Sequence, residues 1–328
     1  MRDTILYDSA LRLFGDHVSP QVLEAAEAGE WPSELWRAVD EAGYLDVLAD
    51  GTGGMVEAVA ILRAAGHHAA PIPLPETMLA RWLCAASGID APAGPLSVAL
   101  AEPDDPARYA PVPWGAVAEA VAIVSGSSLR LAGRTDIRLE AGASLAGEPR
   151  DVLTAIENGR SAALPNAVSA EIVRGVGALL RAAQMAGAME AALDLATTYA
   201  NDRVQFGRPI GKFQAIQQQL ALLAEEAAAA LVAVESAAVS VAEGRQSAEF
   251  AVPAAKIRAG EAAGRVAETA HQVHGAIGFT EEHSLHYLTR RLWSWRDEFG
   301  DEAYWAELLG RRIAAAGGAG LWPLITEP

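Results

Sequence analysis

An arginine, a phenylalanine and a glutamine are spaced along residues 203–214 in a way that suits a flat, anionic ligand. The segment reads Arg-Val-Gln-Phe-Gly-Arg-Pro-Ile-Gly-Lys-Phe-Gln. Arg203 carries a fixed fork of donors that suits a pyrophosphate, the ring of Phe206 can lie against a flat or sugar group, and Gln214 can donate and accept hydrogen bonds. The Phe-Gly pair and the following Arg-Pro pair predict a reversal of the chain that exposes these groups.

A second segment, residues 272–279, reads Gln-Val-His-Gly-Ala-Ile-Gly-Phe. Gly275 and Gly278 predict a loop between helices in which the backbone can approach a ligand closely and offer its N–H groups. Gln272 can reach the edge of an adenine or a ribose. Either segment alone is typical of an ordinary helix end or turn. Their occurrence together favours a binding site for a dinucleotide.

The elements that position these segments follow a helix, sheet, helix order. Residues 1–94 predict a helical domain, with Pro20 at a helix start and a stiff proline connector at residues 71–75. Short, partly β-branched runs at 96–100, 120–124 and 128–131 predict strands of a small middle domain over residues 95–155. Residues 156–328 predict a helical bundle, in which a helix over about 170–201 leads into the first segment. The fold class is therefore mainly α with an inserted β domain.

The bulk composition limits the classes of partner that this chain is expected to bind. A chain of 328 residues with 51% hydrophobic residues can bury a sizeable core, and its formal net charge of −17 disfavours binding to nucleic acid or to anionic membranes. The single cysteine, Cys84, excludes an internal disulfide and fits a cytoplasmic location. The N-terminus has no signal-peptide pattern, and Glu235 interrupts the apolar stretch at 227–241, so we expect no membrane insertion.

The two segments together resemble the paired C-terminal signatures of the acyl-CoA dehydrogenase family of flavoproteins. The resemblance implies an N-terminal helical bundle, a middle β-sheet or barrel, a C-terminal four-helix bundle and FAD as cofactor. It also implies that the ADP part of FAD is held, for the flavin of a neighbouring subunit, by the residues matching the family pattern. These are Arg203, Phe206, Gly207, Gln214, Gln272, Gly275 and Ala276, the last in place of a second glycine.

The part of the family pattern that does chemistry departs from this sequence. The family reaction removes an α proton from an acyl-CoA with a carboxylate while hydride passes to the flavin. Phe299 stands where most of the family carries its catalytic glutamate, and the alternative family position matches Gly177. The resemblance therefore leaves the catalytic residue unknown. Glu298 and Asp301 are weak candidates, since an acidic helix start explains them more simply.

The middle segment also lacks the family residues that hold the flavin ring. The family usually has Thr-Glu-Pro followed by Gly-Ser-Asp, and later a strand with tryptophan against the ring. Residues 101–106 read Ala-Glu-Pro-Asp-Asp-Pro with no Gly-Ser-Asp after them, and Trp114 lies in a Val-Pro-Trp-Gly context that does not match that strand. This sequence therefore keeps the nucleotide half of the pattern and loses the catalytic half.

This asymmetry predicts a subunit that lends its ADP-binding groups to a homologous catalytic chain. The expected partners are an acyl-CoA substrate, that second dehydrogenase subunit, in a homo- or hetero-oligomer, and an electron-transfer partner. Heteromeric relatives in bacterial steroid side-chain breakdown suggest a bulky acyl group by analogy. Two alternatives remain: a self-sufficient homo-oligomer that uses Glu298 or Asp301 as its base, and a flavin-free scaffold of the same fold.

Two further clusters have simpler explanations than a site. His271 with His274 and His283 with His286 have the spacing of metal ligands on a helix, but a di-iron bundle needs a second Glu-x-x-His motif, which this sequence lacks. We therefore expect no metal. Tryptophans and arginines alternate over residues 290–312, and the acidity of the whole chain favours a packed interface over a nucleic-acid surface.

Overall fold

The computed structural model describes residues 4–102, 105 and 108–326. Residues 1–3, part of the N-terminus that lacks a signal-peptide pattern, lie outside the described residues. So do Pro103, Asp104, Pro106 and Ala107, the first three of which belong to the middle segment that departs from the family pattern.

The N-terminal part is helical, and its helices begin at the breaks that the sequence predicts. Pro20 occupies the first turn of its helix and Ser19 caps that helix by accepting from the backbone N–H of Val22 at 3.4 Å. The elements are α1 (Thr4–His17), α2 (Pro20–Glu27), α3 (Ser33–Glu41), the 3-10 turns η1 (Tyr44–Asp46) and η2 (Thr52–Gly54), α4 (Met55–His67) and α5 (Leu74–Ala86).

The middle part consists of two small sheets packed face to face. The strands are β1 (Leu96–Leu100), β2 (Val112–Pro113), β3 (Ala120–Ser125), β4 (Ser128–Gly133), β5 (Ile137–Glu140), β6 (Arg150–Ile156) and β7 (Arg160–Ala163), with the 3-10 turn η3 (Arg134–Asp136) before β5. One sheet has the order β1-β3-β4-β7, with β1 parallel to β3, and the other has the order β2-β6-β5.

The period of two along β3 explains how a small sheet is buried on both faces. Ala122 and Val124 join the main core, on the face where α5 packs, whereas Val121 and Ile123 join a second cluster between the two sheets. Because each face of β3 packs against an apolar cluster, both of its faces carry apolar side chains.

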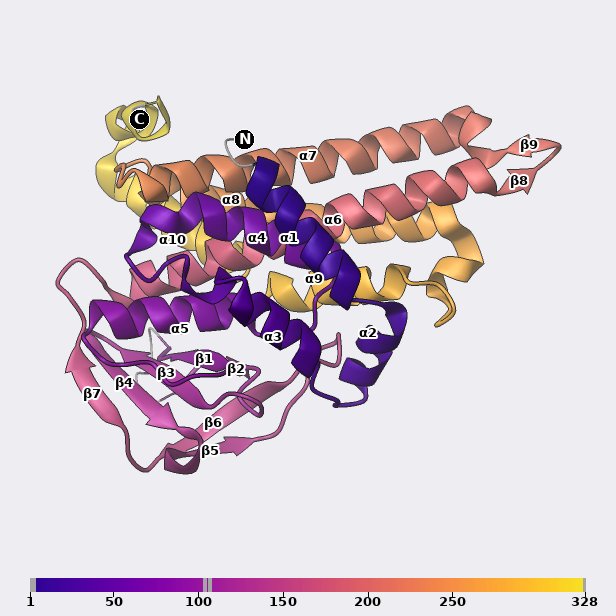
Figure 1. Ribbon diagram of the computed structural model, residues 1–328. Helices are drawn as coiled ribbons and strands as arrows, with labels where there is room; N and C mark the ends of the chain where they lie inside the picture. Colours follow the sequence, from indigo (N-terminus) through magenta and orange to yellow (C-terminus); the bar gives the residue numbers. More distant parts are fainter. Residues whose placement is uncertain (1–3, 103–104, 106–107, 327–328) are drawn as a thin grey trace.

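The C-terminal part is built around α6 (Ala170–Asp202), a single 33-residue helix. A short hairpin of β8 (Val204–Gln205) and β9 (Arg208–Pro209) reverses the chain. It is followed by η4 (Ile210–Lys212), α7 (Gln214–Ala242), α8 (Ala248–His274), η5 (Gly275–Phe279), α9 (Leu285–Arg296), α10 (Glu302–Ala316) and α11 (Gly318–Thr326). The hairpin projects from the end of the α6–α7 pair that lies farthest from the sheets (Figure 1).

The predicted helix, sheet, helix order is confirmed. The strand at 96–100 has the predicted limits, and the helix predicted over about 170–201 ends one residue later. β7 lies beyond residue 155, the predicted end of the middle domain, while the division into domains stays a prediction. No helix in the described part of the chain is both long and apolar enough to cross a bilayer.

Candidate functional site

The hairpin after α6 presents an aromatic ring to solvent. Val204 pairs with Pro209 and Gln205 with Arg208, so only Phe206 and Gly207 form the turn. Both have positive φ, 52° and 80°, the backbone of a type I′ turn, in which glycine is at no steric disadvantage. Phe206 is 92% exposed. An exposed ring on a tight turn gains nothing from burial within its own chain.

The second segment meets this hairpin at the same end of the bundle. The chain runs along α6, back along α7 and forward again along α8, so the C-terminal ends of α6 and α8 are neighbours (Figure 1). The contact is direct: the ring of Tyr199 stacks on that of His274, with centroids 4.8 Å apart. His283 packs against His274 at 4.5 Å. His274 is buried and the other two rings are partly buried, and together they hold the turn at Gly275 beside the hairpin.

All the residues predicted to hold the nucleotide lie exposed on this end of the molecule. Arg208 packs its guanidinium on the ring of Phe213 at 4.3 Å, whereas Arg203 has no ion-pair partner among the described residues. The group therefore offers an uncommitted guanidinium, exposed amides, an exposed ring and a turn with open backbone, which suits a pyrophosphate and its sugar. The exposed set is Arg203, Phe206, Gly207, Gln214, Gln272, Gly275 and Ala276. We call it the nucleotide surface.

The two residues that the sequence predicts at the family's base positions, Phe299 and Gly177, lie together at the other end of α6. A β-carbon built on Gly177 would lie 2.4 Å from Cδ1 of Phe299, so the ring packs directly on the glycine. Phe299 and Gly300 have φ of 56° and 99°, which turns the chain sharply between α9 and α10. At ~1.5 Å per residue, Gly177 and Arg203 are about 39 Å apart along the helix.

A pocket of about 260 Å³ opens beside Phe299. Two of its walls are the β1 residues Val98 and Leu100, and Arg150 and Arg174 also line it. Arg174 is largely buried and lies 3.9 Å from Glu102. The pocket is small, and the carboxylates of Glu102, Asp297, Glu298 and Asp301 also line it.

The two weak candidates for a base both have structural partners. Asp301 caps α10, because its Oδ1 accepts from the backbone N–H of Tyr304 at 2.8 Å. Glu298 is buried and forms an ion pair with the guanidinium of Arg181. The helix-start explanation therefore agrees with the geometry of Asp301 but is wrong for Glu298, which is buried, lines the pocket and belongs to an ion-pair network.

The network around Arg181 is buried and contains more carboxyl groups than guanidinium groups. Arg181 is also paired with Glu76 of α5 and donates to Gln184. One guanidinium thus faces two carboxylates, and burial raises the pKa of Glu76 to about 7, although Arg181 opposes the shift. Glu148 lies nearby and pairs with Arg291 at 3.0 Å, and burial likewise raises the pKa of this carboxyl.

A buried lysine fixes the turn that carries Phe299. Nζ of Lys256 donates to the carbonyl oxygens of Arg296 at 2.5 Å and Gly300 at 2.7 Å. Burial lowers the pKa of this ammonium to about 8. The turn at Phe299 is therefore held by hydrogen bonds from Lys256 of α8 and by the packing of its ring on Gly177 of α6.

Comparison with known proteins decides the family. Residues 175–314 match the C-terminal domain of acyl-CoA dehydrogenases. The chain is 30% identical over 304 residues to the acyl-CoA dehydrogenase IpdE2 of Mycobacterium tuberculosis, in an alignment that covers 88% of this chain and 89% of IpdE2. This chain belongs to the acyl-CoA dehydrogenase family. The acyl-CoA dehydrogenase FadE27 of the same organism is 31% identical over 311 residues, covering 77% of this chain and 80% of FadE27.

Solved structures of acyl-CoA dehydrogenases share the whole fold. The Tcur3481-Tcur3483 steroid ACAD G363A variant superposes with a TM-score of 0.83 at 25% identity and covers 95% of this chain and 98% of that one. The ChsE4-ChsE5 complex from Mycobacterium tuberculosis contains a chain with a TM-score of 0.79 at 24% identity, covering 95% and 97%. The predicted fold class and family are thus confirmed.

The other clusters of this acyl-CoA dehydrogenase are structural. In the part of the chain that the structure describes, no three His, Cys, Asp or Glu side chains are arranged to hold a metal ion. Trp295 and Trp305 are core residues, while Trp293 is partly exposed beneath Arg296. Trp114 follows β2 in a turn, with φ of 57°, so it does not lie in a strand.

Sequence reasoning missed two contributors to the dehydrogenase site. Glu76 was not singled out, because it looks like any acidic residue in the first turn of a helix. Tyr199 was also missed, although a tyrosine one turn before Arg203 is a signal that an aromatic support lies there. The roles of the nucleotide surface itself stay predictions.

Proposed function

We propose that this chain is the non-catalytic subunit of a mixed acyl-CoA dehydrogenase and lends its nucleotide surface to FAD held mainly by a catalytic partner. The observation that carries the proposal is the distance of about 39 Å between Gly177 and Arg203 along α6. That distance exceeds the length of an extended FAD molecule. A pyrophosphate on Arg203 therefore belongs to a flavin whose ring lies in another subunit.

In this proposal each exposed group has a defined task. The guanidinium of Arg203 pairs with the pyrophosphate, Phe206 covers the sugar or adenine, and Gln272 hydrogen bonds to the nucleotide edge. The turn at Gly275, with φ of 65°, brings backbone close to the ligand. FAD supplies the acceptor for two electrons, which no side chain can do.

The partner supplies the proton-removing carboxylate. Phe299 and Gly177 occupy the two family positions and neither can accept a proton. Asp301 and Glu298 are engaged as a helix cap and in the Arg181 pair, which disfavours a self-sufficient homo-oligomer. The substrate is an acyl-CoA thioester. The steroid ACAD among the similar structures supports a bulky acyl group, with electrons passing to a separate acceptor protein.

Flavin content tests the proposal. We expect the chain purified alone to carry little flavin and to show no acyl-CoA turnover, and the complex co-expressed with its catalytic partner to be yellow and active. Arg203→Ala should release flavin from that complex, because the pyrophosphate loses its charged donor. Arg37→Ala, an exposed arginine paired with Glu41 on α3, is the matched control and should leave flavin bound.

The outcomes separate the alternatives. Full flavin occupancy and turnover by the lone chain would show a self-sufficient enzyme. A stable but colourless and inactive complex would show a scaffold. Unchanged flavin retention in the Arg203→Ala complex would remove the role assigned to that guanidinium.

A further inference from the structure

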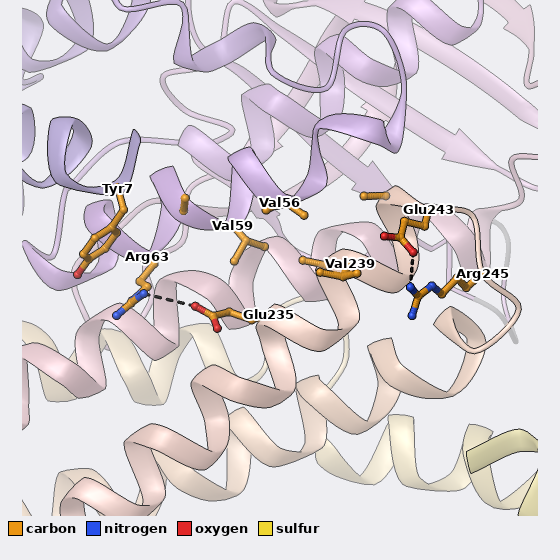
Figure 2. Close-up of a pocket in the computed structure, with 11 residues that line it drawn as sticks. Tyr7, Val56, Val59, Arg63, Glu235, Val239, Glu243 and Arg245 are labelled. Carbon is orange, nitrogen blue, oxygen red and sulfur yellow. Dashed lines mark ion pairs between the residues drawn. The ribbon is translucent and has the colours of Figure 1, made fainter. Parts of the chain in front are cut away.

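A cleft of about 370 Å³ lies between α4 and α7. Tyr7 of α1 and Arg63 of α4 bound one end, and Glu243 and Arg245, at the turn after α7, bound the other (Figure 2). Its volume lies at the lower end of the ~300–1,000 Å³ typical of small-molecule sites. We call it the α4–α7 cleft. It shares no lining residue with the nucleotide surface or with the pocket at Phe299.

The walls of the α4–α7 cleft are short and apolar. Val56 and Val59 of α4 face Val239 of α7, and alanines and Glu235 complete the walls (Figure 2). Alanine and valine are too short to fill the space between the two helices, so the hollow persists. Covering such walls with an apolar molecule removes apolar surface from water, which is the main favourable term in binding.

A clamp of polar contacts centred on Arg63 joins the helices that form the cleft. The guanidinium of Arg63 donates two hydrogen bonds of 2.6 Å to Glu190 of α6 and lies 3.5 Å from Glu235 of α7. The Arg63 guanidinium also lies over the ring of Tyr7, with its Cζ atom 4.3 Å from the ring centroid. Because Arg63 is bonded to both α6 and α7, this end of the cleft is fixed and a ligand needs to order little there on binding.

The charges at both ends are already compensated. Arg63 is paired with Glu190 and Glu235, and Arg245 is paired with Glu243. Glu190 lies outside the lining, so two carboxylates and two guanidiniums line the cleft, and an anionic head group meets no unpaired guanidinium. Burial raises the pKa of the Tyr7 phenol, which therefore stays neutral. A molecule with several phosphates, such as a CoA thioester, fits this balance poorly.

We propose that the α4–α7 cleft binds a neutral, apolar small molecule, at a site separate from the one that serves FAD and acyl-CoA. The proposal does not depend on the proposed function, because it rests only on the walls, the clamp and the charge balance of this cleft. A cationic ligand gains little, since each exposed carboxylate already has its arginine.

Three small molecules with the same octyl tail test which head-group charge the cleft accepts. Isothermal titration calorimetry of the full chain with 1-octanol, octanoate and octylammonium compares a neutral, an anionic and a cationic head on the same apolar tail. We expect 1-octanol to bind and each charged probe to bind at least about tenfold more weakly. Equal or tighter binding of octanoate or octylammonium would overturn the neutral class, and no binding of 1-octanol would overturn the site.

Matched variants on α7 test the location. Val239→Trp fills the cleft, whereas Val232→Trp places the same ring on the solvent face of the same helix, at a residue that is 64% exposed. We expect Val239→Trp to weaken 1-octanol binding at least about tenfold and Val232→Trp to leave it unchanged. Equal binding by both variants would sink the proposal. Ala242→Phe fills the other end of the cleft and replaces Val239→Trp if thermal unfolding shows that variant to be unfolded.

Discussion

Phe299 lies directly on Gly177, so the two residues that the sequence predicts at the carboxylate positions of acyl-CoA dehydrogenases are joined here in one packing contact. The residues are far apart in sequence, one in the turn before α10 and one in the third turn of α6. The Phe299 ring fills the space that a side chain at position 177 would occupy.

Gly177→Ala should therefore destabilise the chain. The added β-carbon meets the Phe299 ring at 2.4 Å, and overpacking of this kind costs about 1–3 kcal/mol. Chemical denaturation measures the change. Gly310→Ala is the control, since Gly310 is exposed within α10 with no atom near its β position, and it should stabilise by up to about 1 kcal/mol. A Gly177→Ala cost that persists undiminished in a Phe299→Ala background would contradict the contact.

Glu76→Gln should change how stability depends on pH. The folded pKa of about 7 is higher than the ordinary 4.5, so this group contributes stability that is fully present below pH 4.5 and is lost as pH rises through 7. The loss is at most about 3.5 kcal/mol, at ~1.4 kcal/mol per pKa unit. Removing the carboxyl should therefore benefit the protein more at pH 8 than at pH 4.5.

Urea unfolding of the wild type and Glu76→Gln at both pH values measures this difference. Glu157→Gln, at an exposed carboxylate paired with Arg138, is the control and should show a much smaller difference. The assignment fails if the Glu76→Gln effect is the same at the two pH values.

Asp301→Ala should cost stability without affecting catalysis by the complex. Asp301 caps α10, and loss of a cap costs about 1 kcal/mol, while asparagine is as good a cap as aspartate. Asp301→Asn should therefore be close to neutral. Thermal unfolding and acyl-CoA turnover of the complex are measured together. Loss of turnover in both variants would instead identify Asp301 as a base.

Phe206→Ala should leave folding intact and weaken the retention of flavin by the complex. The ring is 92% exposed, so its removal should change the free energy of unfolding of this chain by no more than about 0.5 kcal/mol. Flavin release is followed by absorbance during dilution of the complex. Ile5→Ala, at an 80% exposed residue of α1, serves as the control. Equal retention in both variants would show that Phe206 does not contact the coenzyme.

The sequence by itself determined the local features of this protein. The strand at Leu96–Leu100, the helix start at Gln214 and the reversal at Phe206 and Gly207 follow from β-branched runs, helical periodicity and turn residues, which act over a few positions. The absence of a carboxylate at Phe299 is likewise visible without a structure.

The tertiary structure alone decided which of these features meet. Only packing brings Tyr199 onto His274, places Glu76 with Glu298 around one guanidinium, and sets Phe299 on Gly177. It also separates the nucleotide surface from Phe299 by the length of α6. Spacing along a chain specifies which face of a helix or strand a residue occupies. Which other element packs against that face depends on how elements distant in sequence bury their apolar surfaces against one another. No local sequence pattern encodes that pairing.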